Sequence, residues 1–390
     1  MPWRESSLMS ERLAFIQACL GRTERIVDVC DQFGISEKTG HKLLRRFREE
    51  GPAGLADRSH APHHQPHRMS AAVAARILAL RKNHPLYGPV KLRDWLQQHE
   101  PALPWPAASS IGALLQRQGR VRPRRRRRAA GAGLHGGTPA TTPNAVWTAD
   151  FKGEFRLHGG PYCYPLTVLD LQSHFLLGCV AKPSTAVGSA RTTFQHLFQA
   201  YGLPVAIRTD NGVPFAQPNA LGRLGALAFW WVSLGIRPQH IAPGRPAENG
   251  AHERFHKTLK AATTRPAAAS FAAQQRRFDR FRREYNTDRP HASLPHHCPP
   301  AQVYDASPRP YPRRLPALVY APGTDLRLVS GQGFIRWRNH AVFLSSNLAG
   351  HYVGLTESET DLFTVAYGPL ALGELDPILN RFTPRVRWVG

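Results

Sequence analysis

The chain has 390 residues, of which 42% are hydrophobic, and a formal net charge of +24. This length is too great for one small core and predicts two to four domains, while so large a positive charge indicates a partner that carries many phosphates, nucleic acid first. The five cysteines form no C-x-x-C pair, which argues against a disulfide scaffold or a zinc ribbon and makes a reducing cytosol the simpler location. No apolar run approaches the roughly 18 residues that cross a bilayer, so we expect a soluble, cytoplasmic protein.

Residues 1–60 show the pattern of a helix-turn-helix DNA-binding domain. Apolar residues recur at helical spacing over 10–20, 24–33 and 37–49, and the last two segments are preceded by the N-cap candidates Thr23 and Ser36. The third helix carries basic side chains of the kind that reach phosphates and base edges in the major groove. The alternative is a solvated basic helix in a small bundle. The residues predicted to contact DNA from this helix are Lys38, Lys42, Arg45 and Arg46.

Residues 61–135 predict a second helical DNA-binding domain. A Pro/His-rich stretch at 61–67 is interpreted as a linker, because its irregular spacing does not suit a metal cluster, and helical periodicity returns over 71–83, 89–99 and 109–118. An arginine run and a Gly/Ala-rich stretch follow, and a basic flexible arm suits a phosphate backbone or a minor groove. The arm consists of Arg124, Arg125, Arg126, Arg127 and Arg128.

A change of period marks the next domain. Apolar residues alternate with polar ones where Trp147, Ala149 and Phe151 predict a strand with two different faces. Two more strand candidates complete an antiparallel meander, and a helix, a buried strand, a second helix and another strand follow. This order predicts an α/β core at 140–305, with a mixed five-stranded sheet and flanking helices. Five short strand candidates within 316–390 predict a small C-terminal β-barrel.

Three acidic residues in the predicted core could lie close together in the folded chain. Asp150 lies in the middle of a strand, where aspartate is disfavoured without a partner or a purpose, and Asp210 follows the short buried strand that comes after the first long helix. Glu253 lies on a predicted helix and shares a face with Lys257 and Lys260 at i+4 and i+7, a pattern that is also ordinary on a helix surface. Carboxylates bind Mg²⁺ or Mn²⁺. Two such ions roughly 3.5–4 Å apart stabilise the attacking oxygen and the leaving oxygen when a phosphodiester bond is cleaved or joined.

Three blocks of sequence carry a resemblance. Trp147–Gly153 (WTADFKG), Arg208–Gly212 (RTDNG) and Gly244–Lys260 (GRPAENGAHERFHKTLK) resemble the signature blocks of the DDE transposase and retroviral integrase superfamily, particularly bacterial insertion-sequence transposases with an integrase core. The likeness covers residues 142–303, and the two helical domains ahead of it resemble the DNA-binding region of the same group.

The resemblance implies a ribonuclease-H-like core and a DNA transposase that cleaves strands at element ends and transfers them into target DNA. Asp150, Asp210 and Glu253 fall on the family's catalytic and metal-binding acids, which hold two ions of Mg²⁺ or Mn²⁺. Asn249, Lys257 and Lys260 would contact DNA. The implied partners are terminal inverted repeats, target DNA and further copies of the chain in a homo-oligomer, in a bacterial cytoplasm and at the nucleoid.

One departure concerns the third acid. The 42 residues between Asp210 and Glu253 exceed the spacing common in the family, and an insertion around 216–231 would account for the difference. Glu248 is the competitor, since it lies nearer to Asp210 within the same block, but the residues after Glu253 follow the family pattern. Two other functions stay open, a DNA-binding regulator that has lost catalysis and a ribonuclease H that acts on RNA–DNA hybrids.

Overall fold

The computed structural model describes residues 7–21, 24–58, 69–121, 138–151, 153–241, 250–358 and 362–389. The chain divides into two compact units, Met1–Arg68 and Met69–Gly390. The predicted arginine arm and the acid Glu248 lie outside the described residues, and so do Asn249 and the predicted cap Thr23.

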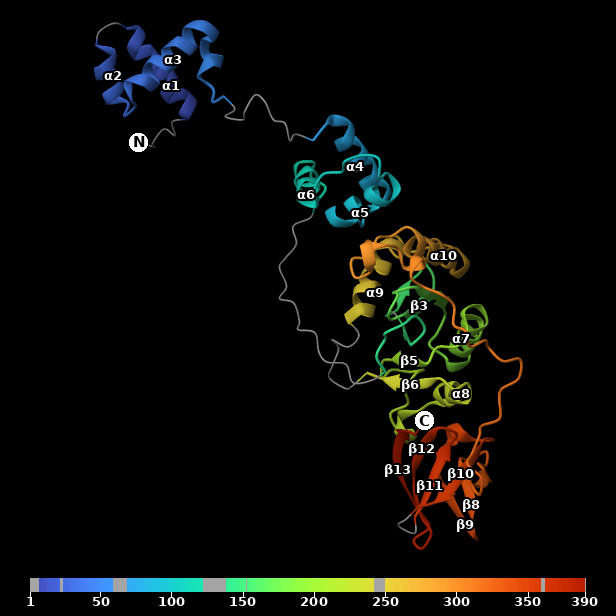
Figure 1. Cartoon of the computed structure of the whole chain (residues 1–390). Coiled ribbons are helices and arrows are strands. Elements are labelled where there is room, and N and C mark those ends of the chain that lie inside the picture. The colour runs from blue at the N-terminus through green and yellow to red at the C-terminus, as the bar shows by residue number, and fades with distance from the viewer. Residues whose placement is uncertain are drawn as a thin grey trace. The chain divides into compact units, whose positions relative to one another are not determined.

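The first unit is the predicted three-helix bundle, made of α1 (Leu8–Leu20), α2 (Ile26–Gln32) and α3 (Glu37–Glu50) (Figure 1). The Ser36 side chain accepts a hydrogen bond from the Thr39 backbone N–H and caps α3, as its position in the sequence predicts. At Gly40 the helices approach so closely that an added Cβ would lie 2.4 Å from the Cys30 sulfur. A glycine is therefore required where α3 crosses α2.

The second unit begins with the other predicted bundle, α4 (Ala71–Asn83), α5 (Pro89–His99) and α6 (Ala108–Arg117). Its core is apolar, and it contacts the α/β core domain at several polar groups, of which Asp288 receives two donors. That carboxylate accepts hydrogen bonds from the Trp95 indole at 2.7 Å and the Tyr87 hydroxyl at 3.3 Å. The side chain of His84 also lies 3.2 Å from the Glu284 carboxylate. Aromatic donors on this bundle are thus satisfied by acids at the end of a helix of the core.

The core is a mixed sheet with the strand order β4–β3–β1–β5–β6, and a short β2 pairs with β3 beside β1. The three strands β1, β3 and β4 are antiparallel neighbours, whereas β5 and β6 add to β1 in parallel. The mixed sheet predicted from the sequence is confirmed, and the strand bounds differ from expectation by a few residues. The strands are β1 (Val146–Phe151), β2 (Phe155–Arg156), β3 (Tyr162–Asp170), β4 (Leu176–Lys182), β5 (Ala206–Thr209) and β6 (Arg237–His240).

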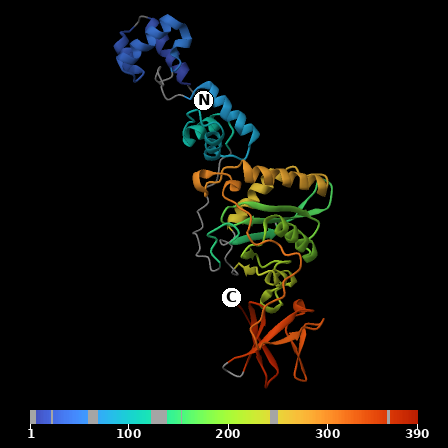
Figure 2. The same ribbon diagram turned by 45° about the vertical axis from the view of Figure 1, so that its right-hand side comes forward.

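Helices cover both faces of this sheet (Figure 1, Figure 2). One face packs Trp147 and Ile207 against α7 (Val187–Tyr201) and α8 (Ala226–Ser233). The opposite face packs against α9 (Gly250–Thr263) and α10 (Phe271–Thr287). Because alternate residues of a strand point to opposite faces, Trp147 and Ala149 enter the first core while Thr148 and Asp150 face α9.

The helix α8 is buried on all sides, which explains its apolar sequence. Trp230 and Trp231 pack into the core of the mixed sheet, whereas Phe229 and Val232 pack into the core of the C-terminal region. In the same connection, the Gln217 side chain accepts a hydrogen bond of 2.8 Å from the Asn347 amide. The extra segment expected around 216–231 therefore packs against the C-terminal region. Within the described ranges no helix combines the length and apolar character that a bilayer crossing requires.

The C-terminal region forms an open sheet rather than the closed barrel predicted from the sequence. Five strands pair in the order β13–β12–β11–β10–β7, and β8 and β9 form a separate hairpin. Sheet and hairpin share one apolar core with α8. Among the described residues β13 and β7 remain the two ends of the order. The strands are β7 (Asp325–Leu328), β8 (Phe334–Trp337), β9 (His340–Phe343), β10 (Tyr352–Glu357), β11 (Phe363–Tyr367), β12 (Leu370–Asp376) and β13 (Arg381–Trp388), of which the last two were not expected.

Candidate active site

Two of the predicted acids stand at the same end of adjacent parallel strands. The register of β1 and β5 pairs Ala149 with Thr209, so Asp150 and Asp210 are the next residues on each chain. The Asp150 side chain is 17% exposed, and Asp210 is half-buried. Parallel pairing brings these two carboxyl groups, far apart in the sequence, to one edge of the core.

A buried polar network surrounds Asp150. The Thr167 hydroxyl, from the neighbouring strand β3, donates to the Asp150 carbonyl oxygen at 3.0 Å. The same hydroxyl oxygen lies 2.8 Å from the Nε2 atoms of both His252 and His256 on α9. Because the single hydroxyl proton goes to the Asp150 carbonyl, both imidazoles donate to this oxygen. The Thr148 hydroxyl, 3.2 Å from His252 Nδ1, donates to the other side of that ring.

Burial determines the charge of His252. It is 1% exposed, and burial, reinforced by the nearby His256, lowers its pKa well below the usual value. The imidazole is therefore neutral, in agreement with a ring that donates through one nitrogen and accepts through the other. His256 Nδ1 lies 3.7 Å from the Asp150 carboxylate. A neutral imidazole and a carboxylate are both suitable ligands for a divalent ion.

The turn after β5 holds Asp210 close to the backbone. A Cβ added to Gly212 would lie 2.9 Å from an Asp210 carboxylate oxygen, so a larger residue there would displace the Asp210 side chain. The Asn211 amide donates to the Ile241 carbonyl at 2.8 Å and ties the turn to the end of β6. His240, the last residue of β6, has a pKa lowered by burial, which the charge of Asp210 opposes.

The third predicted acid lies on the outer face of α9. Glu253 occupies the first turn of the helix and is exposed, as are Lys257 and Lys260, so these three share the face that the sequence predicted. A different face of α9 is buried, and it includes Thr263 but not Ala262, which is exposed. The full set of buried residues that are described on α9 is His252, Phe255, His256, Leu259 and Thr263.

Asp150 meets histidines more closely than it meets the other acids. Among the described residues, the ligand atoms that lie within 4.8 Å of one another around Asp150 come from His252 and His256, and this group does not include Asp210 or Glu253. The sequence interpretation overlooked both histidines. Their i, i+4 spacing, in line with the apolar Phe255 and Leu259, was the available signal that they face the sheet.

The predicted DNA-reading helix α3 presents a basic face in the first unit. Lys38, Lys42 and Arg45 are exposed and line a groove of about 750 Å³ together with His41 and Arg48. Arg46 is half-buried and borders a different pocket, next to Arg12 and Asp57. Three of the four predicted residues therefore line the groove.

The region that carries the candidate active site matches known protein families. A family model described as integrase core domain matches residues 140–246, and a second model with the same description matches residues 234–299. Residues 140–299 carry an integrase core domain, in agreement with the resemblance to the DDE transposase and retroviral integrase superfamily. Ahead of the integrase core, a helix-turn-helix domain model matches residues 11–63 and a homeodomain-like domain model matches residues 39–115. The sequence resemblance is thus confirmed, and the chain has the core of a family of nucleic-acid-processing enzymes.

Individual relatives include bacterial and viral proteins. An uncharacterised protein of insertion element IS476 from Xanthomonas euvesicatoria is 27% identical, with 67% of this chain and 75% of the relative covered. The Pol polyprotein of feline endogenous virus ECE1 is 29% identical over 33% of this chain, which spans only 12% of the polyprotein. Among solved structures, the HTLV-2 integrase catalytic core domain in complex with magnesium aligns with 15% identity and a TM-score of 0.33, covering 42% of this chain and 98% of that domain.

The network around Asp150 predicts a stability cost for losing one hydroxyl. Replacing Thr167 by Val leaves the donors of His252 and His256 without their acceptor in a buried position, and unsatisfied buried groups cost about 1–3 kcal/mol each. We expect Thr167→Val to lower the free energy of unfolding by at least about 1 kcal/mol in a urea titration. Thr192→Val, at an exposed hydroxyl on α7, is the matched control and should change it by less than about 0.5 kcal/mol. Equal effects of the two substitutions would contradict the network.

Proposed function

We propose that the chain is a DNA transposase that cleaves strands at element ends and joins them to target DNA with the acids Asp150, Asp210 and Glu253. The observation that carries the proposal is the register of β1 and β5, which brings Asp150 and Asp210 to one edge of the sheet. Glu253 lies in the first turn of α9, whose buried histidines contact the Asp150 strand. The Glu253 side chain is exposed, so the proposal requires the first turn of α9 to move and bring this carboxylate to the two aspartates.

The residues fit a divalent-ion site in their chemistry. Asp150 and Asp210 supply carboxylate oxygens, and Glu253 would complete a set of ligands that suits Mg²⁺ or Mn²⁺, two ions in all. When bound, such ions activate the attacking oxygen and stabilise the leaving oxygen of a phosphodiester. Clustered carboxylates repel one another, so we expect the three acids to converge only when the charge of an ion offsets that repulsion.

The reaction proposed has two displacements at phosphorus. In the first, water forms a P–O bond while the bond to a 3′-oxygen breaks, which leaves a 3′-hydroxyl on the element end. In the second, that hydroxyl forms a P–O bond with a target strand and displaces its 3′-oxygen, so the number of ester bonds is unchanged. Asp150 and Asp210 would hold the reacting phosphate at the sheet edge, and Lys257 and Lys260, on the exposed face with Glu253, would bind the adjoining backbone.

We also propose four functional parts, at 1–60, 61–135, 140–305 and 316–390. The basic groove along α3 would enter a major groove of an inverted repeat, and Arg124 to Arg128 would bind phosphates nearby. Asn249, directly before α9, would contact DNA beside Glu253. The formal charge of +24 supports an extended DNA contact, and a homo-oligomer would hold two element ends together.

Substitution of each acid tests the catalytic assignment. Asp150→Asn, Asp210→Asn and Glu253→Gln should each reduce cleavage and strand transfer by about 10³-fold or more, the scale seen when one member of a catalytic set is lost. Gel-shift binding of element ends should persist in all three. Glu248→Gln is the matched control and should remain active. An active Glu253→Gln with an inactive Glu248→Gln reverses the assignment, and activity on RNA–DNA hybrid alone supports a ribonuclease H instead.

Thermal denaturation with and without Mg²⁺ tests the ion site separately from activity. A bound ion stabilises only the folded state, so Mg²⁺ at about one hundred times its Kd should add roughly 2.7 kcal/mol and raise Tm. The rise should disappear in Asp150→Asn, because that substitution removes a ligand charge. A control titration with choline chloride at equal ionic strength separates site binding from screening. An undiminished rise in Asp150→Asn would count against the site.

The first unit predicts a phosphate-dependent contribution to DNA affinity. Lys42→Gln and Arg45→Gln remove exposed charges from α3, and each lost phosphate contact should make the slope of log K against log salt less steep by about 1. Fluorescence anisotropy with a labelled element end, repeated over a salt series, measures this slope. Arg58→Gln serves as the control, because Arg58 is already paired with Glu50. The interpretation fails if all three variants keep the original slope.

A further inference from the structure

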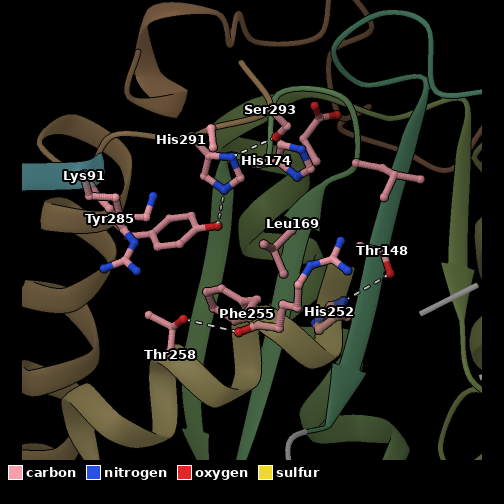
Figure 3. Close-up of a pocket in the computed structure, with 15 residues that line it drawn as sticks. Lys91, Thr148, Leu169, His174, His252, Phe255, Thr258, Tyr285, His291 and Ser293 are labelled. Atoms are coloured by element: carbon pink, nitrogen blue, oxygen red, sulfur yellow. Dashed lines mark hydrogen bonds between the residues drawn. The ribbon is translucent and has the colours of Figure 1, made fainter. Parts of the chain in front are cut away.

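A cavity of about 380 Å³ lies beside the candidate active site, on the α9 side of the sheet. Its wall includes Thr148 and His252 of the Asp150 network, and Figure 3 shows these two side chains joined by a hydrogen bond near the cavity. Other lining residues come from β3, from the end of α10 and from α5 of the second helical bundle. The volume falls within the roughly 300–1,000 Å³ of ordinary ligand pockets.

Three cations line this cavity, and they come from separate elements. Lys91 lies on α5, Arg254 on α9 and Arg289 just after α10. Among the residues that the structure describes, none of the three forms a salt bridge with a carboxylate, since the ion pairs found there join other residues. Lys91 instead donates to the Pro290 carbonyl oxygen, and the Arg289 guanidinium lies 5.2 Å from the centre of the Tyr87 ring.

Among the other polar side chains that line the cavity, Asp170 is the one carboxyl group and the imidazoles are neutral. Asp170 is buried and accepts three hydrogen bonds, from the Asn144 N–H and from the N–H and hydroxyl of Ser173. His291 stacks on His174 with ring centres 4.4 Å apart and lies between the Tyr285 hydroxyl and Ser293, as Figure 3 shows. Burial lowers the pKa of both imidazoles, that of His291 to about 3, so both rings are neutral near pH 7.

The cavity therefore has three cations against one carboxyl group, and two of the cations, Lys91 and Arg289, are partly buried while Arg254 is exposed. Burial and the neighbouring Arg289 lower the pKa of Lys91 to about 8, which shows that its ammonium group is destabilised there. An anion with several acceptor oxygens would relieve this repulsion and satisfy donors from three elements at once.

We propose that the cavity walled by Lys91, Arg254 and Arg289 binds a phosphate group, supplied either by a DNA backbone or by free phosphate. A phosphate bound there connects α5 of the helical bundle to α9. Arg254 is the residue after Glu253, so occupancy would also restrain the turn that carries this acid. That consequence for Glu253 rests on the proposed function, whereas phosphate binding itself does not.

The test uses the full chain and two probes, inorganic phosphate and a DNA duplex. The variants are Arg254→Gln and Lys91→Gln, and Arg276→Gln on the exposed side of α10 is a control with the same loss of charge. Phosphate near ten times its Kd should raise the Tm of the unaltered chain by about 2 °C relative to chloride at equal ionic strength. The rise in Tm should persist in Arg276→Gln and disappear in the two cavity variants. A rise that is the same in all variants would be a general salt effect.

The salt dependence of duplex binding then identifies the source of the phosphate. If DNA supplies it, the slope of log K against log salt should become less steep by about 1 in Arg254→Gln and stay unchanged in Arg276→Gln. An unchanged slope with a lost phosphate shift supports the site and assigns it to free phosphate. The proposal is overturned if the unaltered chain shows no phosphate shift, or if Arg254→Gln and Lys91→Gln retain it. A chain that keeps the shift but fails to cut DNA separates this site from the proposed catalysis.

Discussion

The parallel pairing of β1 with β5 is the constraint on which the rest of the candidate site depends. It places Ala149 opposite Thr209, so the two aspartates that follow come to one edge of the sheet although they lie far apart in the sequence. The apolar side of β1 secures this arrangement, because Trp147 and Ala149 are buried beneath α7 and α8. A slip of one residue would move Asp150 into that apolar core, where an unpaired charge is strongly disfavoured.

The opposite side of β1 is polar, and its side chains form a defined set of hydrogen bonds with α9. Thr148 and Thr167 supply hydroxyl groups that match the imidazoles of α9, so the helix is attached to the strand by directional bonds as well as by Phe255. Directional bonds set the rotation of α9 about its own axis, which apolar packing alone leaves loosely defined. The rotation in turn decides that Glu253 is on the outer face and that Arg254 reaches the adjoining cavity.

Sequence periodicity was sufficient for the helices of both bundles, which have one buried face, and for β1, in which apolar residues alternate with polar ones. It failed where burial is not one-sided, as in α8, whose residues are apolar throughout and show no period. The strands β12 and β13 were missed because Gly373 and Pro384 interrupt them, at a point where the pairing register shifts. Among site residues, the acids followed from motif and spacing. The spacing of His252 and His256 indicated which face of α9 they occupy, but their hydrogen bonds to Thr167 depend on the packing of α9 against β3, which the sequence does not show.

The position of α8 between two apolar cores has an evolutionary consequence. Phe229 and Val232 are covered by the C-terminal sheet, and the preceding loop contributes Gln217 to the same junction. A homologue that lost the terminal sheet but retained this helix would expose an apolar surface and tend to aggregate. The long β5–β6 connection and the terminal sheet should therefore be kept or lost together in evolution. Relatives with a short connection should lack the sheet or attach it at another place.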